Sequence, residues 1–224
     1  MISTIRAALE PHGIFMRGVV GFEGGEVGPL LVSGSRAESV VLLGNIGGSI
    51  WEPFSRWRAA PGNFERRDPL DDWSKSVIAP IGEALGATAY FPSDPPWQPF
   101  QRWAMRAEGL KPSPLGILIH PEYGLWHGYR GALGFAFRLD IPLAPTGPHH
   151  CDDCREKPCM SHCPVSAVTP AAFEVATCRS HLRTPIGQGG CMRGGCLARN
   201  ACPVGSAYRY PREQLAFHMA ALNF

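Results

Sequence analysis

The chain has 224 residues, enough for one large domain or two small ones with buried cores. Its net charge of +2 and pI near 8.2 give no broad basic surface, so we expect no nucleic-acid partner. No apolar run reaches the length of a membrane span or a signal-peptide core, which predicts a cytoplasmic protein without a membrane partner. Thiols stay reduced in the cytoplasm, so the eight cysteines are more readily explained as metal ligands than as disulfides.

Cysteines and tryptophans divide the chain into two parts. All eight cysteines lie between Cys151 and Cys202, whereas all six tryptophans precede residue 130. The proline-rich segment 141–150 lies between the two sets and has the composition of a linker. We therefore predict two domains, residues 1–145 and residues 146–224.

Strand and helix signals alternate through the first predicted domain. Residues 38–45 form a short β-branched apolar run, typical of a buried strand. Residues 68–86 predict a helix that Asp68 caps, Gly86 ends and Pro80 kinks or splits. This alternation predicts an α/β or α+β fold. The further elements that we expect are a strand at 87–92, a helix at 99–110, strands at 115–121 and 133–142, and helices at 171–183 and 212–224 of the second domain.

The cysteines form two sets with spacings close to those of iron–sulfur ligands. The stretch CDDCREKPCMSHCP, residues 151–164, is two residues longer in its middle than the ferredoxin run C-x2-C-x2-C-x3-C-P. We expect the extra residues to bulge out at EKP, residues 156–158. In two-cluster ferredoxins the fourth cysteine of each run binds the other cluster. This crossing predicts two [4Fe–4S] clusters, the first held by Cys151, Cys154, Cys159 and Cys202, and the second by Cys163, Cys178, Cys191 and Cys196.

Two four-cysteine zinc sites are the alternative interpretation of the same residues. A zinc ribbon would show paired C-x2-C knuckles, and only Cys151 and Cys154 have that spacing. The Cys-Pro pairs at Cys163 and Cys202 favour iron–sulfur clusters instead. A non-redox binding module held together by two structural zinc ions remains the rival hypothesis.

The segment LGILIHPEYGLWHGYRGALGF, residues 115–135, is followed by the cysteine run, by an isolated cysteine in CRSHL at 178–182 and by a final Cys-Pro pair. Together these features resemble the epoxyqueuosine reductase family and, more distantly, the reductive dehalogenases. The resemblance implies a nitroreductase-like α/β domain that binds cobalamin, followed by a small ferredoxin-like domain whose clusters pass electrons to the corrin. The family's glycine–lysine segment is missing and there is no room for its tRNA-holding repeats. We therefore expect a small relative and not epoxyqueuosine reduction itself.

A dense group of polar and aromatic side chains follows the predicted strand at 115–121. Ligands of α/β sheets usually lie beyond strand ends, which makes the group a candidate wall of a cofactor pocket. Packing of this loop onto the cysteine module is an equally good interpretation, because aromatic and histidine clusters often serve packing alone. The group consists of His120, Tyr123, Trp126, His127, Tyr129 and Arg130.

Charged residues near the cysteines suggest secondary roles. His162 and His181 could tune a cluster through hydrogen bonds to its sulfurs, or lie on the surface, and His149 and His150 are expected to be exposed linker residues. Six basic residues could offset cluster charge or dock an acidic partner: Arg155, Lys157, Arg179, Arg183, Arg193 and Arg199.

No nucleophile–base arrangement or carboxylate pair stands out, so we assign no catalytic residue. The chain is then an electron-transfer protein or an oxidoreductase of the cobalamin-dependent type. The partners that we expect are a redox protein, such as a flavodoxin or a reductase, and a small-molecule substrate.

Overall fold

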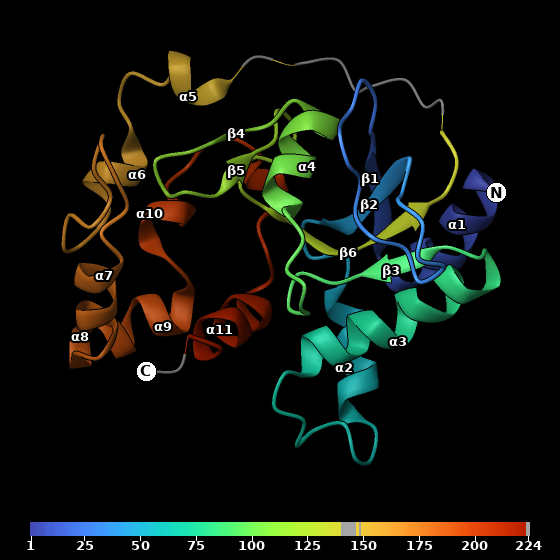
Figure 1. Ribbon diagram of the computed structural model, residues 1–224. Coiled ribbons are helices and arrows are strands. Elements are labelled where there is room, and N and C mark those ends of the chain that lie inside the picture. Colours follow the sequence, from blue (N-terminus) through green and yellow to red (C-terminus); the bar gives the residue numbers. More distant parts are fainter. Residues whose placement is uncertain (140–146, 148, 223–224) are drawn as a thin grey trace. The chain divides into compact units, whose positions relative to one another are not determined.

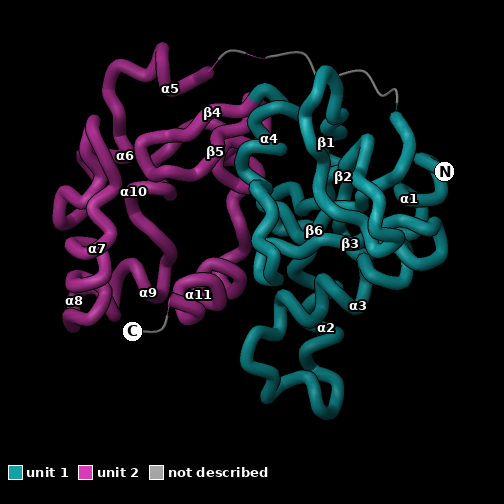
Figure 2. The backbone as a smooth tube through the Cα atoms, viewed as in Figure 1, with its two compact units in different colours: residues 1–109, 128–146 teal, residues 110–127, 147–224 magenta. Residues whose placement is uncertain are grey.

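The computed structural model describes residues 1–139, 147 and 149–222 (Figure 1). The chain divides into two compact units, one of residues 1–109 and 128–146, the other of residues 110–127 and 147–224 (Figure 2). The predicted linker and the predicted boundary after residue 145 lie largely outside the described residues. The second unit also takes in residues 110–127, which precede the boundary expected from composition.

The first unit is built on a four-stranded sheet in the order β1-β2-β6-β3. Strand β1 (Ile14–Gly21) pairs antiparallel with β2 (Ser39–Ile46), and β3 (Thr88–Tyr90) pairs antiparallel with β6 (His127–Phe135). This mixture of helices and antiparallel strand pairs agrees with the α+β class. The strand predicted at 133–142 is shifted: β6 begins at His127 and ends at Phe135, and residues 140–142 lie outside the described part.

Strand β2 carries the centre of the first unit's core. The strand predicted at 38–45 is confirmed, and residues 39–45 are all buried. Successive side chains of a strand point to opposite faces, so a strand buried throughout is covered on both faces. The helices of this unit are α1 (Ile2–Leu9), the short 3-10 helix η1 (Glu10–His12), α2 (Trp51–Ala59), α3 (Pro69–Ala84) and α4 (Phe100–Glu108).

Helix α3 confirms its predicted start but not its predicted break. It begins at Pro69, although the side chain of Asp68 makes no capping hydrogen bond. The expected split at Pro80 is wrong, because the helix runs on to Ala84. It buries Trp73 and Ile78 before the proline and Gly82 after it, so packing holds both sides in one helix. Gly86 follows the helix with a left-handed φ of +63°, which glycine adopts without strain.

The second unit consists mainly of short helices and loops. The strand predicted at 115–121 shrinks to β5 (Leu118–Ile119), paired with β4 (Lys111–Pro112), since Gly116 turns with a φ of +73° just before it. The helices predicted at 171–183 and 212–224 are present as α7 (Val175–Leu182) and α11 (Arg212–Ala220). The other helices are α5 (His150–Asp153), α6 (Pro158–Ser161), α8 (Pro185–Gly189), α9 (Cys191–Gly194), α10 (Leu197–Asn200) and the 3-10 helix η2 (Ser206–Tyr208).

In the part of the chain that the structure describes, every helix is too short or too polar to cross a membrane.

Candidate metal centres

Four cysteines surround a small cavity in the second unit. The cavity has a volume of about 30 Å³, and Leu115, Ile119 and Leu125 contribute apolar side chains to its lining. The residues around it include no acidic side chain. The cysteines that line it are Cys151, Cys154, Cys159 and Cys202, which together are the predicted ligand set of the first cluster.

The other four cysteines surround a second cavity of the same volume, about 30 Å³. Val168, Phe173 and Leu182 are among its apolar lining residues, and Met219 of α11 reaches it as well. The cysteines are Cys163, Cys178, Cys191 and Cys196, the predicted ligand set of the second cluster. The chain thus brings together the two groups of four that the crossed spacing predicts, with Cys163 and Cys202 exchanged between the two runs.

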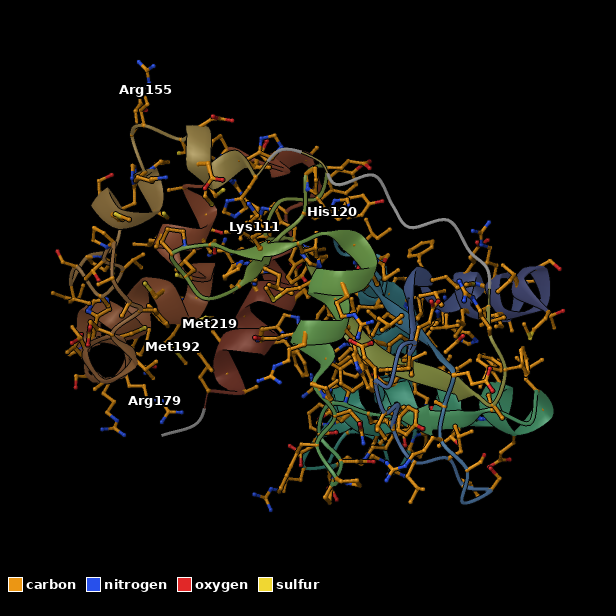
Figure 3. The ribbon with its side chains drawn as sticks, turned by 45° about the horizontal axis from the view of Figure 1, so that its top comes forward. Lys111, His120, Arg155, Arg179, Met192 and Met219 are labelled. Carbon is orange, nitrogen blue, oxygen red and sulfur yellow. The ribbon has the colours of Figure 1, made fainter. Side chains whose placement is uncertain are left out.

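The backbone explains how the longer first run still encloses a cavity. Helix α5 carries Cys151, and α6 begins at Pro158 and carries Cys159. Between them Lys157 adopts a left-handed φ of +43°, and its ammonium group donates a hydrogen bond to the carbonyl of Cys151. Arg155 and Glu156 are exposed, and Figure 3 shows Arg155 projecting away from the ribbon. The bulge therefore lies at Arg155 and Glu156 and not at residues 156–158 as expected, because Lys157 and Pro158 line the cavity together with Cys159.

Backbone N–H groups point at the sulfurs of four cysteines, among them Cys159, which accepts from its own amide and that of Met160. The amide of Ala167 donates to Sγ of Cys163 at 3.2 Å. Amides of Ala198 and Arg199 donate to Cys196, and the amide of Val204 donates to Cys202. Hydrogen bonds to sulfur favour the thiolate form and tune the potential of a bound cluster.

Burial nevertheless opposes negative charge on these thiols. It raises the pKa of Cys151 to about 11, with a further contribution from the nearby thiol of Cys202. Burial likewise raises the pKa of Cys178 and Cys196. A metal cation displaces the proton of a coordinating thiol, so these sites suit a positively charged centre better than free thiols.

Among the described residues, no three His, Cys, Asp or Glu side chains converge closely enough to hold one metal ion.

Arg199 lies beside the cysteines and is held by aromatic rings and a backbone carbonyl. Its guanidinium lies 4.4 Å from the ring centre of Trp126 and 4.8 Å from that of Tyr210, and it donates to the carbonyl of Leu125. Because Arg199 lies between Cys196 and Cys202, this stacking fixes a loop that supplies one cysteine to each cavity. Of the other predicted basic residues, Arg155, Arg179, Arg183 and Arg193 are exposed, and Arg179 also projects outward in Figure 3.

The histidines near the cysteines fall into two groups. His181 is buried and lines the second cavity. His150 lines the first cavity, where its Nε2 lies 2.9 Å from the carbonyl of Pro121. The expectation that His150 is an exposed linker residue is therefore wrong, because it is partly buried in helix α5 and lines the cavity. Its position directly before Cys151 was the sequence signal that could have indicated this. His162 is exposed and its Nδ1 lies 2.9 Å from the carbonyl of Pro158, so it lies on the surface.

The predicted pocket wall divides between the two units. In the second unit His120 stacks on Tyr123 at 4.1 Å, and Nε2 of His127 lies 3.0 Å from the carbonyl of Leu118. Trp126 is fully buried against Tyr210. These contacts match the interpretation of a loop packed onto the cysteine module.

The remaining two residues of the predicted wall belong to the first unit. Tyr129 donates a hydrogen bond of 2.6 Å to Glu108, a carboxylate that also forms a buried ion pair of 2.8 Å with Arg17. Burial raises the pKa of Glu108, partly offset by Arg17. Arg130 lies 3.8 Å from Asp71. The six residues therefore do not form one wall within either unit.

The chain matches no protein-family model, and no curated protein is significantly similar to it. The family interpretation rests on the motifs quoted above, and the functional interpretation rests on the two cysteine-lined cavities.

Proposed function

We propose that this protein transfers single electrons through two [4Fe–4S] clusters held in its second unit. The observation that carries the proposal is the sorting of the eight cysteines into two cavities of four, with Cys163 and Cys202 exchanged. Spacing alone predicts this exchange for a two-cluster protein. Two independent zinc sites would not require it.

The residues around each cavity fit such a cluster. Four thiols supply one ligand for each iron, the apolar lining excludes water, and amide N–H groups such as that of Ala167 point at the ligand sulfurs. When bound, each cluster would supply one-electron redox chemistry.

One apolar cluster of side chains borders both cavities. It includes Cys159 and Cys202 of the first set together with Cys163 and Cys196 of the second. This shared wall supports electron transfer from one cluster to the other within the unit. The ammonium of Lys157 and the guanidinium of Arg199 would offset part of the negative charge of two all-cysteine clusters. Exposed arginines such as Arg155 offer contacts for an acidic redox partner, for example a flavodoxin or a reductase.

The proposal extends to the fold family. We assign a nitroreductase-like fold to the first unit and a ferredoxin-like fold to the second, supported by the motifs at residues 115–135 and by the crossed cysteines. Within each unit, the six residues expected to line a corrin pocket make their contacts with protein groups. We therefore derive no step through cobalamin.

Analysis of the purified protein tests the proposal. The full chain, purified without oxygen, should contain about eight iron and eight acid-labile sulfide per chain. Zinc in stoichiometric amount without sulfide would overturn the proposal and establish the structural zinc module. If cobalt is bound in addition to iron, the proposed function would extend to the cobalamin-dependent reduction of a small substrate.

A further inference from the structure

The first unit contains a large open cavity that the cysteine chemistry does not use. Its volume is about 920 Å³, and it is bounded by the loop of residues 22–36, strand β3, the segment 91–99 and helix α4. Its floor is apolar and firmly packed: Tyr90 and Trp103 are both buried and meet edge to face at 6.1 Å. A cavity of this size, with an aromatic floor, is typical of a site for a small organic molecule.

Apolar side chains are exposed around this cavity. Val27 is 70% exposed, Leu30 54%, Val32 90% and Trp97 74%, and all four line it. Large apolar side chains gathered in one place cost free energy in water unless something covers them, and such patches mark binding sites. Two hydrogen bonds hold the loop that carries Val32. The amide of Val32 donates to Oγ1 of Thr88, and the hydroxyl of Tyr90 donates to the carbonyl of Leu30.

The charges around the cavity do not balance. Both acidic lining residues are paired: Glu26 with Arg106 at 2.8 Å, and Asp94 with Lys75 at 2.6 Å. Arg36 and Arg102 also line the cavity, and neither has a carboxylate partner among the described residues. The guanidinium of Arg36 donates to the carbonyl of Gly28, at 3.4 Å. The cavity therefore presents two positive charges beside an apolar surface.

We propose that this cavity binds a small organic anion with a flat apolar body. The body would cover Trp97 and the aromatic floor, and the carboxylate, sulfonate or phosphate group of the ligand would meet Arg36 and Arg102. A guanidinium binds such groups through paired, charge-assisted hydrogen bonds. The site lies entirely in the first unit, so it can be tested independently of the metal content of the second.

A pair of matched probes tests both halves of this recognition. The probes are 8-anilinonaphthalene-1-sulfonate, which is anionic, and N-phenyl-1-naphthylamine, which has the same aromatic body without the charge. Calorimetric titration of the full-length, anaerobically purified protein should show one sulfonate bound per chain. Arg36→Gln and Arg102→Gln should each weaken the sulfonate about tenfold and leave the neutral probe within about twofold. Trp97→Ala should weaken both probes.

Controls keep the test specific to this cavity. Arg67→Gln removes an exposed arginine that does not line the cavity, and it should leave both affinities unchanged. All variants must have the same iron content and the same circular dichroism spectrum. We expect this because Arg36 and Arg102 are exposed, so their substitution should leave the fold unchanged. The proposal is overturned if the sulfonate does not bind, or if the variant lacking both arginines binds it as tightly as the original. The proposal is also overturned if the protein is a dimer that the Trp97→Ala substitution dissociates. A second copy of the chain would then occupy the cavity.

Discussion

In the first unit, strand β2 is buried from residue 39 to 45, and Phe54 and Trp73 pack fully enclosed against each other. In the second unit, the described helices between residues 150 and 200 have at most eight residues, and cysteines occupy much of the interior. Helices this short are unstable alone in water. The first unit is thus organised by apolar burial, whereas under the proposed function the second would also depend on the clusters that its cysteines bind. The two units would then differ in the conditions under which they fold.

Removing the metal should destabilise the second unit much more than the first, and this is the largest effect that we expect. In iron-free protein, prepared by chelation under reducing conditions, we expect amide protection in residues 150–200 to fall at least about a hundredfold. Protection in β2 should change by less than about threefold, because its core contains no cysteine. Hydrogen exchange followed by mass spectrometry measures both segments in one sample. Equal loss in both segments would show that the two units fold together.

Single cysteine substitutions should show which cysteines of the second unit bind the same cluster. Cys163→Ala should remove about half of the iron and give the same electron paramagnetic resonance spectrum as Cys178→Ala, since both cysteines line the second cavity. Cys202→Ala should match Cys151→Ala in the same way. If Cys163→Ala resembled Cys159→Ala instead, the exchange of ligands between the two runs would be wrong.

A large-to-small change should affect the first unit alone. Phe54→Ala should lower its free energy of unfolding by about 3–5 kcal/mol, because the side chain is completely buried. The iron content should not change. Urea denaturation followed by tryptophan fluorescence gives the first quantity, and iron analysis gives the second. Arg56→Ala on the same helix is the matched control: its ion pair with Glu52 is exposed, and its loss should cost less than about 0.5 kcal/mol.

Alkaline pH should weaken the first unit through Tyr90. Burial raises the pKa of Tyr90 from 10.0 to about 12. Below pH 10 the folded and unfolded chains both keep the phenol proton, so there is no effect there. Between pH 10 and 12 only the unfolded chain loses it, so stability falls as pH rises, by up to about 2.7 kcal/mol.

Tyr90→Phe isolates this effect. It should flatten the difference between urea denaturation at pH 9 and at pH 11.5. Below pH 10 it should cost about 1 kcal/mol, for the lost hydrogen bond to the carbonyl of Leu30. An unchanged pH dependence in the variant would contradict the role of Tyr90.

The sequence predicts several local elements well, because these depend on short-range patterns. The spacing of the cysteines predicts the groups of four that line the two cavities, although Cys151 and Cys202 lie far apart in the chain. The buried strand at 38–45 and the helix that starts at Pro69 follow from apolar runs and capping signals. Strand β1 was not predicted, because Arg17 lies in its middle. That arginine is buried with the carboxylate of Glu108, a residue 91 positions away, and the carbonyl of Asn45 as partners of its guanidinium. Long-range pairing of this kind leaves no local signal.

Residues 110–127 illustrate a second limit. Their apolar residues would suit either core, and composition placed them with the tryptophan-rich part. In the structure Leu125 and Trp126 belong to the second unit, because the guanidinium of Arg199 stacks on Trp126 and bonds the carbonyl of Leu125. The large cavity was not predicted for the same reason. The loop of residues 22–36, which carries Arg36, and helix α4, which carries Arg102, come together only in the folded chain.

The exchange of Cys163 and Cys202 between the cavities also sets an order of completion during translation. The first cysteine run is synthesised early, yet its cavity lacks a fourth thiol until Cys202 has been added. The second cavity has all its thiols once Cys196 has been made. Synthesis therefore supplies the last thiol of the second cavity before the last thiol of the first, which reverses the order in which the two cysteine runs begin.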